Sequence, residues 1–203
     1  MPSPKPLGAE AIGLQERARS APHAWGLRSR SVAATRSIGR LIGQALRGGE
    51  ILALYGELGT GKTALVSGIA AGLAAPPHSV SSPTFVFIHH YRGRLPLAHA
   101  DLYRIDSFAE VRSLGLSDCL DGHTVLAIEW AEKAGTELPH DRLEVRLNHK
   151  GKTSREIFFE SQGPASAGLL AQIKRLHQAA PKGGIVLSGR RIRSTGRQQA
   201  GGT

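Results

Sequence analysis

The segment Gly56–Thr63, with the sequence GELGTGKT, constrains this chain more than any other feature. It matches the pattern G-x-x-x-x-G-K-[ST] at every fixed position. It follows the short apolar run Ile51–Tyr55 and precedes apolar residues at helical spacing over residues 62–73. Glycines let the backbone N–H groups of such a loop turn inward, and the N-terminus of a helix favours an anion. The sequence therefore predicts a strand, a phosphate-binding loop and a helix, in preference to an ordinary strand–turn–helix corner.

This loop predicts a site for ATP and Mg²⁺. The Lys62 ammonium is expected to contact the β- and γ-phosphates, and the Thr63 hydroxyl is expected to ligate Mg²⁺. No [NT]-K-x-D guanine signature is apparent, which leaves the preference for ATP over GTP open. The residues predicted to contact the nucleotide in this loop are Glu57, Leu58, Gly59, Thr60, Gly61, Lys62 and Thr63.

A site of this type needs a further acidic group for the metal or the attacking water, and this group usually ends an apolar strand beside the strand of the loop. Two carboxylates fit: Glu129 ends the run that begins at Val125, and Asp101 ends the run that begins at Leu97. The alternative for each is a carboxylate in solvent or in a surface ion pair. We favour the functional reading for Glu129 first and for Asp101 second.

Three further features have alternative interpretations. Thr84 is either a switch threonine that senses the γ-phosphate through Mg²⁺ or the ordinary first residue of a strand. Trp130 either stacks near the nucleotide or fills the core. Three histidines lack a clear ligand geometry and are predicted to be polar residues on strand faces: His89, His90 and His99.

The length of 203 residues is sufficient for one compact α/β domain. We predict a leader over residues 1–30, a domain over 31–178 and a disordered basic tail over 179–203. Within the domain, Ser31 is predicted to cap a helix. The remaining predicted elements are a strand at 84–88 paired with 95–100, a short helix at 108–114, a strand at 125–128, a hairpin of 142–149 and 155–160, and a helix at 165–177.

The net charge of +10 lies in the flanks of the chain. Residues 1–50 carry eight Lys or Arg against three acids, residues 181–203 carry five against none, and residues 51–180 are neutral. A basic tail can bind tRNA weakly in a salt-dependent way, although a solubilising tail is the simpler interpretation. Cys119 is the only cysteine, and the sequence contains no run of about 18 apolar residues. We therefore expect no disulfide within the chain, no membrane span and a cytoplasmic protein.

Several motifs together resemble the TsaE family, also called YjeE, over roughly residues 31–175. The family is the ATPase component of the bacterial tRNA threonylcarbamoyladenosine machinery. The motifs that carry the resemblance, in order, are the loop Gly56–Thr63, Ser82-Pro-Thr-Phe85, His99-Ala-Asp-Leu-Tyr-Arg104, Ile128-Glu-Trp130 and Leu138-Pro139.

The resemblance implies a P-loop NTPase-like mixed β-sheet flanked by helices and slow hydrolysis of ATP. It implies action through a TsaB–TsaD pair, which transfers threonylcarbamoyl to adenosine 37 of tRNAs that read codons starting with A. The protein alone is expected to be a monomer. The resemblance assigns phosphate binding to Lys62, Mg²⁺ to Thr63 and Glu129, and support of the metal or water to Asp101. It places Thr84 in a switch-like segment. Arg155 either reaches the nucleotide or forms a salt bridge across its hairpin.

Two other functions fit parts of the sequence. A small-molecule P-loop kinase would share the phosphate-binding loop but needs an arginine-rich lid, for which Arg92 and Arg94 are the available pair. A non-enzymatic RNA-binding module would use the positive charge. The neutral central region and the lack of clustered aromatic residues argue against it.

Overall fold

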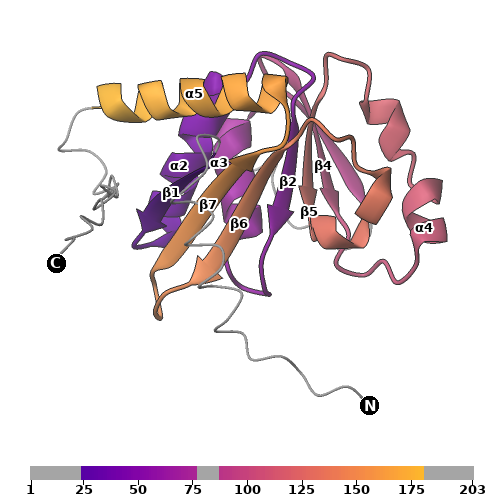
Figure 1. Ribbon diagram of the computed structural model, residues 1–203, viewed down its shortest axis with the longest axis horizontal. Coiled ribbons are helices and arrows are strands. Elements are labelled where there is room, and N and C mark those ends of the chain that lie inside the picture. The colour runs from indigo at the N-terminus through magenta and orange to yellow at the C-terminus, as the bar shows by residue number, and fades with distance from the viewer. Residues whose placement is uncertain (1–23, 77–86, 181–203) are drawn as a thin grey trace, which may run out of the picture.

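The computed structural model describes residues 24–76 and 87–180. In this part of the chain, seven strands form one sheet in the order β1-β7-β6-β2-β5-β4-β3 (Figure 1). The strands are β1 Ala24–Ser29, β2 Ile51–Tyr55, β3 Ile88–Arg92, β4 Pro96–Asp101, β5 Val125–Glu129, β6 Leu143–His149 and β7 Arg155–Ser161. The helices are α2 Val32–Ala45, α3 Lys62–Gly72, α4 Phe108–Ser113 and α5 Pro164–Ala179, with short 3₁₀ turns η1 Leu116–Cys119, η2 Ala131–Lys133 and η3 Gly135–Glu137.

The sheet is mixed, and its parallel strands lie at its centre. β2 pairs in parallel with β6 on one side and with β5 on the other, and β5 pairs in parallel with β4. β3, β7 and β1 are antiparallel to their neighbours. Because parallel strands end at the same edge of a sheet, the last residues of β2, β5 and β4 lie together. This edge carries the start of the predicted phosphate-binding loop, Glu129 and Asp101.

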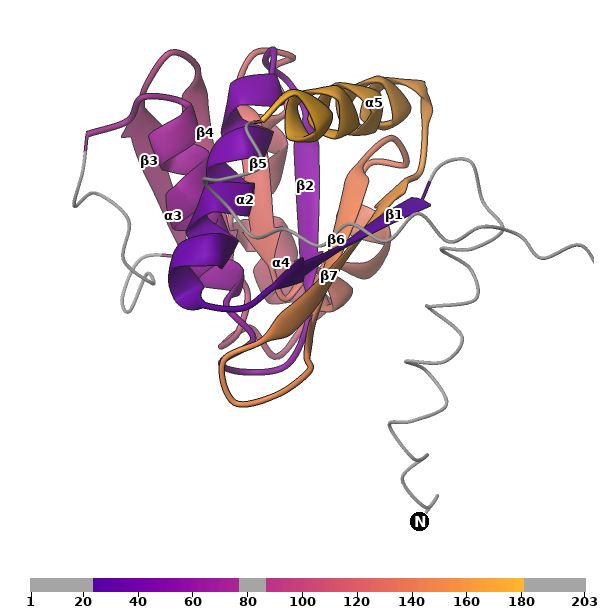
Figure 2. The ribbon, with the colours of Figure 1, turned by 90° about the vertical axis from the view of Figure 1, so that its left-hand side faces the viewer.

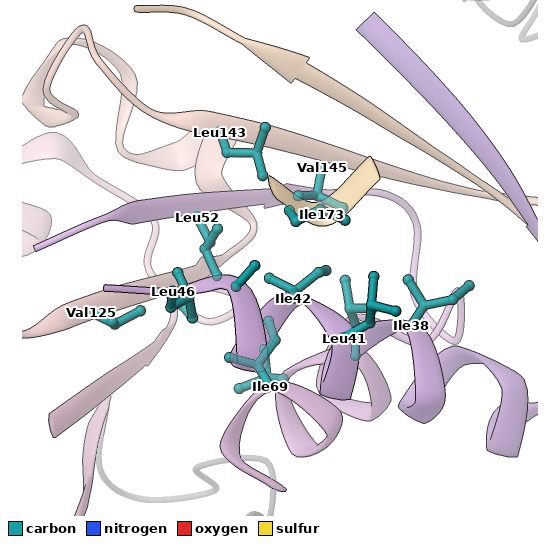
Figure 3. Packing of buried hydrophobic residues seen from close by; sticks show 14 of the residues in the cluster. Ile38, Leu41, Ile42, Leu46, Leu52, Ile69, Val125, Leu143, Val145 and Ile173 are labelled. Atoms are coloured by element: carbon teal, nitrogen blue, oxygen red, sulfur yellow. The ribbon is translucent and has the colours of Figure 1, made fainter. Parts of the chain in front are cut away.

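Buried aliphatic side chains form a core on each face of the sheet. On one face, α2, α3 and α5 pack against the strands, and Figure 3 shows Ile42, Ile69 and Ile173 from these helices in one cluster with Leu52. Complete burial of each such side chain contributes about 1.5–3 kcal/mol. A smaller core on the other face lies beside α4, and Figure 1 shows α4 at the opposite end of the sheet from β1. Cys119 is buried in this smaller core.

α2 begins where the sequence predicts it. The Ser31 side chain accepts a hydrogen bond from the Ala34 N–H at 3.1 Å, so it caps the helix. α2 and α3 then run side by side over the sheet (Figure 2). Their contact is made of glycines, since a Cβ built on Gly39 would lie 2.1 Å from the Leu65 carbonyl oxygen and 2.9 Å from the Gly68 Cα. The backbone of α3, the helix that follows the loop, is thus in direct contact with the backbone of α2.

The structure corrects three predicted boundaries. α5 runs through Ala179, so the helix predicted at 165–177 is longer and residue 179, assigned to a disordered tail, is helical. Residues 24–29, assigned to a loose leader that ended at residue 30, form the edge strand β1, which pairs with β7. A local sequence pattern could not predict this pairing, because β1 pairs with a strand from the other end of the domain. The strand predicted at 84–88 is observed as β3, Ile88–Arg92, and residues 84–86 lie outside the described residues. Its predicted antiparallel hairpin with residues 95–100 is confirmed.

Arg94 does not serve as part of a lid in this structure. Its Nη2 donates hydrogen bonds to the carbonyl oxygens of Gly43 at 3.0 Å and Leu46 at 2.9 Å. These are carbonyls at the C-terminal end of α2, where a cation is stabilising. The observation removes one of the two arginines that the kinase interpretation required. Among the described residues, no helix is both long enough and apolar enough to cross a bilayer.

Candidate functional site

The predicted loop connects β2 to α3 and has the backbone geometry that its glycines allow. Gly56, Gly59 and Gly61 have φ values of 139°, 77° and 100°. The close approach of β6 also leaves no room for a side chain at position 56, because a Cβ there would lie 2.4 Å from the Leu147 carbonyl oxygen. The Thr60 side chain is buried and donates a hydrogen bond to the Glu57 carbonyl oxygen at 2.8 Å. The loop is therefore a defined turn that leads into the N-terminus of a helix.

Lys62 is folded back over this loop. Its Nζ donates hydrogen bonds to the carbonyl oxygens of Gly56 at 2.5 Å and Glu57 at 3.0 Å. The same nitrogen lies 3.9 Å from the centroid of the Trp130 ring. Burial lowers the pKa of Lys62, and this effect outweighs the opposing influence of nearby carboxylates, Glu129 first among them. The ammonium is thus partly desolvated in a position where an anion would stabilise its charge.

Glu129 lies between two side chains from different elements. The Thr63 hydroxyl, in the first turn of α3, donates to Glu129 Oε2 at 3.0 Å. His99 Nε2, on β4, lies 2.9 Å from Glu129 Oε1. The Glu129 residue is only 3% exposed. The structure therefore brings together Thr63 and Glu129, the two residues predicted from the sequence to hold Mg²⁺.

Asp101 lies beside Glu129 on the neighbouring strand. The two residues are in register across β4 and β5. Asp101 is half-buried, and its Oδ1 accepts a hydrogen bond from the Tyr103 N–H at 3.0 Å. Both carboxylates thus end parallel strands at the edge that carries the loop.

A cavity of about 290 Å³ opens at this place. Seven residues of the predicted site line it: Leu58, Gly59, Gly61, Lys62, Thr63, Asp101 and Glu129. Tyr103 and Trp130 complete the lining. A larger depression of about 580 Å³ lies between β3 and η1 and includes none of the predicted site residues. We assign the site to the smaller cavity, because it combines a desolvated ammonium, a hydroxyl and two carboxylates.

Trp130 forms part of the cavity wall. Its φ of 57° places it in the left-handed region, where among the described residues the only other non-glycine is Ala74. A bulky residue in this region is strained, and such strain persists only where the surroundings hold it. The Trp130 ring contacts Lys62 and lies 5.1 Å from the Tyr103 ring. Trp130 also packs against the smaller core, so it both lines the cavity and contacts the core.

Arg155 reaches the loop from β7. Its Nε donates to the Thr60 carbonyl oxygen at 3.2 Å and its Nη2 to the Gly59 carbonyl oxygen at 3.3 Å. Arg155 is only 9% exposed. An ion pair in the hairpin joins Lys150 and Glu156 instead, at 3.4 Å. Arg155 therefore braces the carbonyl side of the phosphate-binding loop.

Replacing Arg155 with Met is expected to lower the free energy of unfolding by about 1–3 kcal/mol, because two loop carbonyls lose a buried charged donor. Urea denaturation measures this change. The control is Lys150→Met, which removes a largely exposed cation from the same hairpin and should change stability by less than about 0.5 kcal/mol. Equal effects of the two substitutions would contradict the bracing role.

The predictions for Thr84 and for the three histidines have different outcomes. Thr84 lies outside the described residues. Of the three histidines predicted to be polar strand-face residues, His90 is exposed, but His99 is fully buried against Glu129. The contact between His99 and Glu129 was not predicted, although His99 and Asp101 are two residues apart on one strand and therefore share a face. Among the residues that the structure describes, no group of three or more His, Cys, Asp or Glu is placed to hold a metal ion.

The fold and the site together define a protein class. A mixed sheet whose central strand runs into a glycine-rich loop, a lysine and a hydroxyl at the start of a helix is a P-loop NTPase-like fold. The sequence model of the family described as "Threonylcarbamoyl adenosine biosynthesis protein TsaE" matches residues 29–157. The chain belongs to the TsaE family.

Individual relatives agree with this assignment. The chain is 37% identical over 129 residues to the tRNA threonylcarbamoyladenosine biosynthesis protein TsaE of Treponema pallidum, covering 64% of this chain and 95% of that protein. The protein of the same name from Bacillus subtilis is 37% identical over 142 residues, covering 70% and 88%. The crystal structure of Bacillus subtilis YdiB superposes with a TM-score of 0.64 and 31% identity, covering 76% of this chain and 96% of YdiB.

Proposed function

We propose that this protein is an ATPase that takes part in forming threonylcarbamoyladenosine at adenosine 37 of tRNAs that read codons starting with A. The observation that carries the proposal is the meeting of Lys62, Thr63 and Glu129 in one cavity at the end of β2. The names of relatives that this chain spans over most of their length support the pathway.

The phosphate groups of ATP suit the loop. The N-terminus of α3 offers backbone N–H groups and a positive dipole end. The Lys62 ammonium can exchange its neutral carbonyl partners, Gly56 and Glu57, for anionic phosphate oxygens, and such charge-assisted hydrogen bonds are the stronger kind. Arg155 keeps the loop carbonyls of Gly59 and Thr60 occupied, so that they do not turn toward the anion.

The chemistry of the donor set fits Mg²⁺. Thr63 and Glu129 provide a hydroxyl and a carboxylate oxygen within 3.0 Å of each other, and Mg²⁺ prefers a few such oxygens together with phosphate and water. Bound there, the ion would neutralise charge on the β- and γ-phosphate oxygens. Asp101, half-buried beside Glu129, is proposed to orient the metal or the attacking water, and Thr84 to belong to a switch-like segment.

Hydrolysis is proposed to be slow in the isolated chain and to depend on a TsaB–TsaD-like pair. P-loop catalysis depends on positioning and charge neutralisation, so an open site is a weak catalyst until a partner completes it. The rim of this cavity carries two apolar side chains in solvent, Leu58 at 68% and Tyr103 at 48% exposure, which suit a protein partner. The basic residues 181–203, which lie outside the described part of the chain, are proposed to add weak affinity for tRNA.

Steady-state hydrolysis of ATP with and without the TsaB–TsaD pair tests this proposal. We expect weak turnover from the chain alone and clear stimulation by the pair, with co-purification that depends on whether ATP, ADP or neither is present. Full turnover by the isolated chain, unchanged by the pair, would refute the dependence on partners. Phosphoryl transfer from ATP to a nucleoside, nucleotide or sugar would instead show a kinase.

Glu129→Gln is expected to keep nucleotide binding and to lose hydrolysis or its dependence on Mg²⁺. The amide has nearly the same shape as the carboxylate but lacks its charge, which is the part that a divalent cation needs. Binding is measured by calorimetry and hydrolysis by phosphate release. A Glu129→Gln protein that hydrolyses ATP at the parent rate, with the parent Mg²⁺ dependence, would remove Glu129 from the site.

A further inference from the structure

We propose that His99 is a positioning residue that fixes the orientation of the Glu129 carboxylate for metal binding. The inference rests on the proposed function, since it concerns the same site. His99 is predicted from the sequence to be only a polar residue on a strand face, but it contacts Glu129. His99 is fully buried on β4, and its Nε2 lies 2.9 Å from Glu129 Oε1.

The two oxygens of Glu129 have different partners. Oε1 faces His99, and Oε2 accepts the Thr63 hydroxyl at 3.0 Å. A carboxylate held at both oxygens has a fixed plane, whereas one held at a single oxygen can rotate. If Thr63 and Glu129 both become metal ligands, their mutual hydrogen bond is exchanged for bonds to the metal. The His99 hydrogen bond on the other oxygen can persist through this exchange.

The direction of the hydrogen bond follows from the chemistry of the two groups. An ionised carboxylate only accepts, so His99 Nε2 must carry the proton and donate. His99 Nδ1 is then the unprotonated nitrogen. It is buried and has no hydrogen-bond partner among the described residues. An unpaired buried acceptor is tolerated more readily than an unpaired N–H, so this tautomer is the one that the surroundings favour.

The sheet places the ring where it can act. In the register of β4 and β5, His99 lies opposite Ala127, and Asp101 lies opposite Glu129. The methyl group of Ala127 leaves room for the imidazole to reach diagonally to Glu129. On the other side, the Tyr91 ring of β3 lies 6.4 Å from the imidazole ring, between centroids. Packing from both neighbouring strands thus restricts the ring to the position from which it donates to Glu129.

Magnesium titrations of ATP binding test this role. The variants are His99→Leu, which removes the donor, and His99→Gln, whose amide N–H₂ can replace Nε2–H. His90→Leu is the matched control, because His90 is an exposed histidine on the neighbouring strand. For His99→Leu we expect the Mg²⁺ concentration at half-saturation to rise about 10-fold or more, as for residues that orient metal ligands. ATP affinity measured in EDTA should change less than about twofold, because Lys62 and the loop are intact. His99→Gln should restore most of the Mg²⁺ response.

An unchanged Mg²⁺ midpoint in His99→Leu overturns the inference, as does a His99→Gln protein that matches His99→Leu. If His99→Leu does not fold, ¹⁵N NMR of the histidine rings in the parent protein decides, with His99 assigned by its missing signals in His99→Gln. A ring protonated at Nε2 supports the inference, and a ring protonated at Nδ1 overturns it. A parent protein that binds no nucleotide overturns the proposed function itself, which none of the His99 outcomes does.

Discussion

Lys62→Ala is expected to weaken ATP binding by about 10- to 100-fold. The ammonium is the compact cation of the loop, and a charge-assisted contact with phosphate is worth roughly 1.5–3 kcal/mol, where 1.4 kcal/mol corresponds to a factor of ten. Its burial and its position over the loop, with hydrogen bonds to Gly56 and Glu57, place it in the anion site before any nucleotide arrives. Isothermal titration calorimetry with Mg²⁺ and ATP measures the change.

The control for this substitution is Lys152→Ala. Lys152 is an exposed lysine in the turn between β6 and β7, so its removal changes the net charge equally but leaves the loop intact. The control should bind ATP within about twofold of the parent protein. Equal losses from both substitutions would mean that general charge attraction, and not the loop, binds the nucleotide. Parent-like affinity in Lys62→Ala would refute the site assignment.

Gly39→Ala is expected to destabilise the fold by about 3 kcal/mol, at the upper end of the cost of overpacking. The added Cβ would lie 2.1 Å from the Leu65 carbonyl oxygen, and this obstacle is backbone that no side-chain rotation can move. α2 and α3 must separate, and α3 carries Lys62 and Thr63 at its start. For a chain of this size, thermal unfolding should shift down by roughly 6–12 °C.

Gly168→Ala provides a control of opposite sign. Gly168 lies within α5, and a Cβ built on it meets no atom within 4 Å. Alanine in a helix interior is more stable than glycine by roughly 0.5–1 kcal/mol, so this substitution should raise the melting temperature slightly. A Gly39→Ala protein that melts at the parent temperature would show that the helices do not depend on their close approach.

The elements nearest the loop could be predicted from sequence because their signals are local. The apolar run 51–55, the glycines after it and the helical spacing from Lys62 are contiguous, and all three are confirmed as β2, loop and α3. The strand that ends at Glu129 is likewise confirmed, and it lies directly beside β2. Carboxylates at the ends of such strands could be assigned to the site from the sequence, because neighbouring parallel strands end at the same edge of the sheet.

The remaining features depend on contacts that no local pattern contains. β1 is an edge strand whose residues alternate weakly, and its pairing with β7 is set by tertiary structure. The loop glycines could be read from the motif, but the reach of Arg155 to Thr60 depends on how β7 lies in the sheet. From the sequence alone, His99 is predicted to be a polar strand residue. Its contact with Glu129 depends on the register of β4 and β5.

The pairing of β1 with β7 has a consequence for synthesis of the protein. The nascent chain emerges from the ribosome N-terminus first, so β1, β2 and the loop emerge long before β7. Until Arg155 has emerged, the carbonyls of Gly59 and Thr60 lack their donor, and β1 has no neighbour to pair with. We therefore expect nascent chains to remain susceptible to proteases until nearly the whole described domain has been translated, with closure of the sheet as a late and slow event.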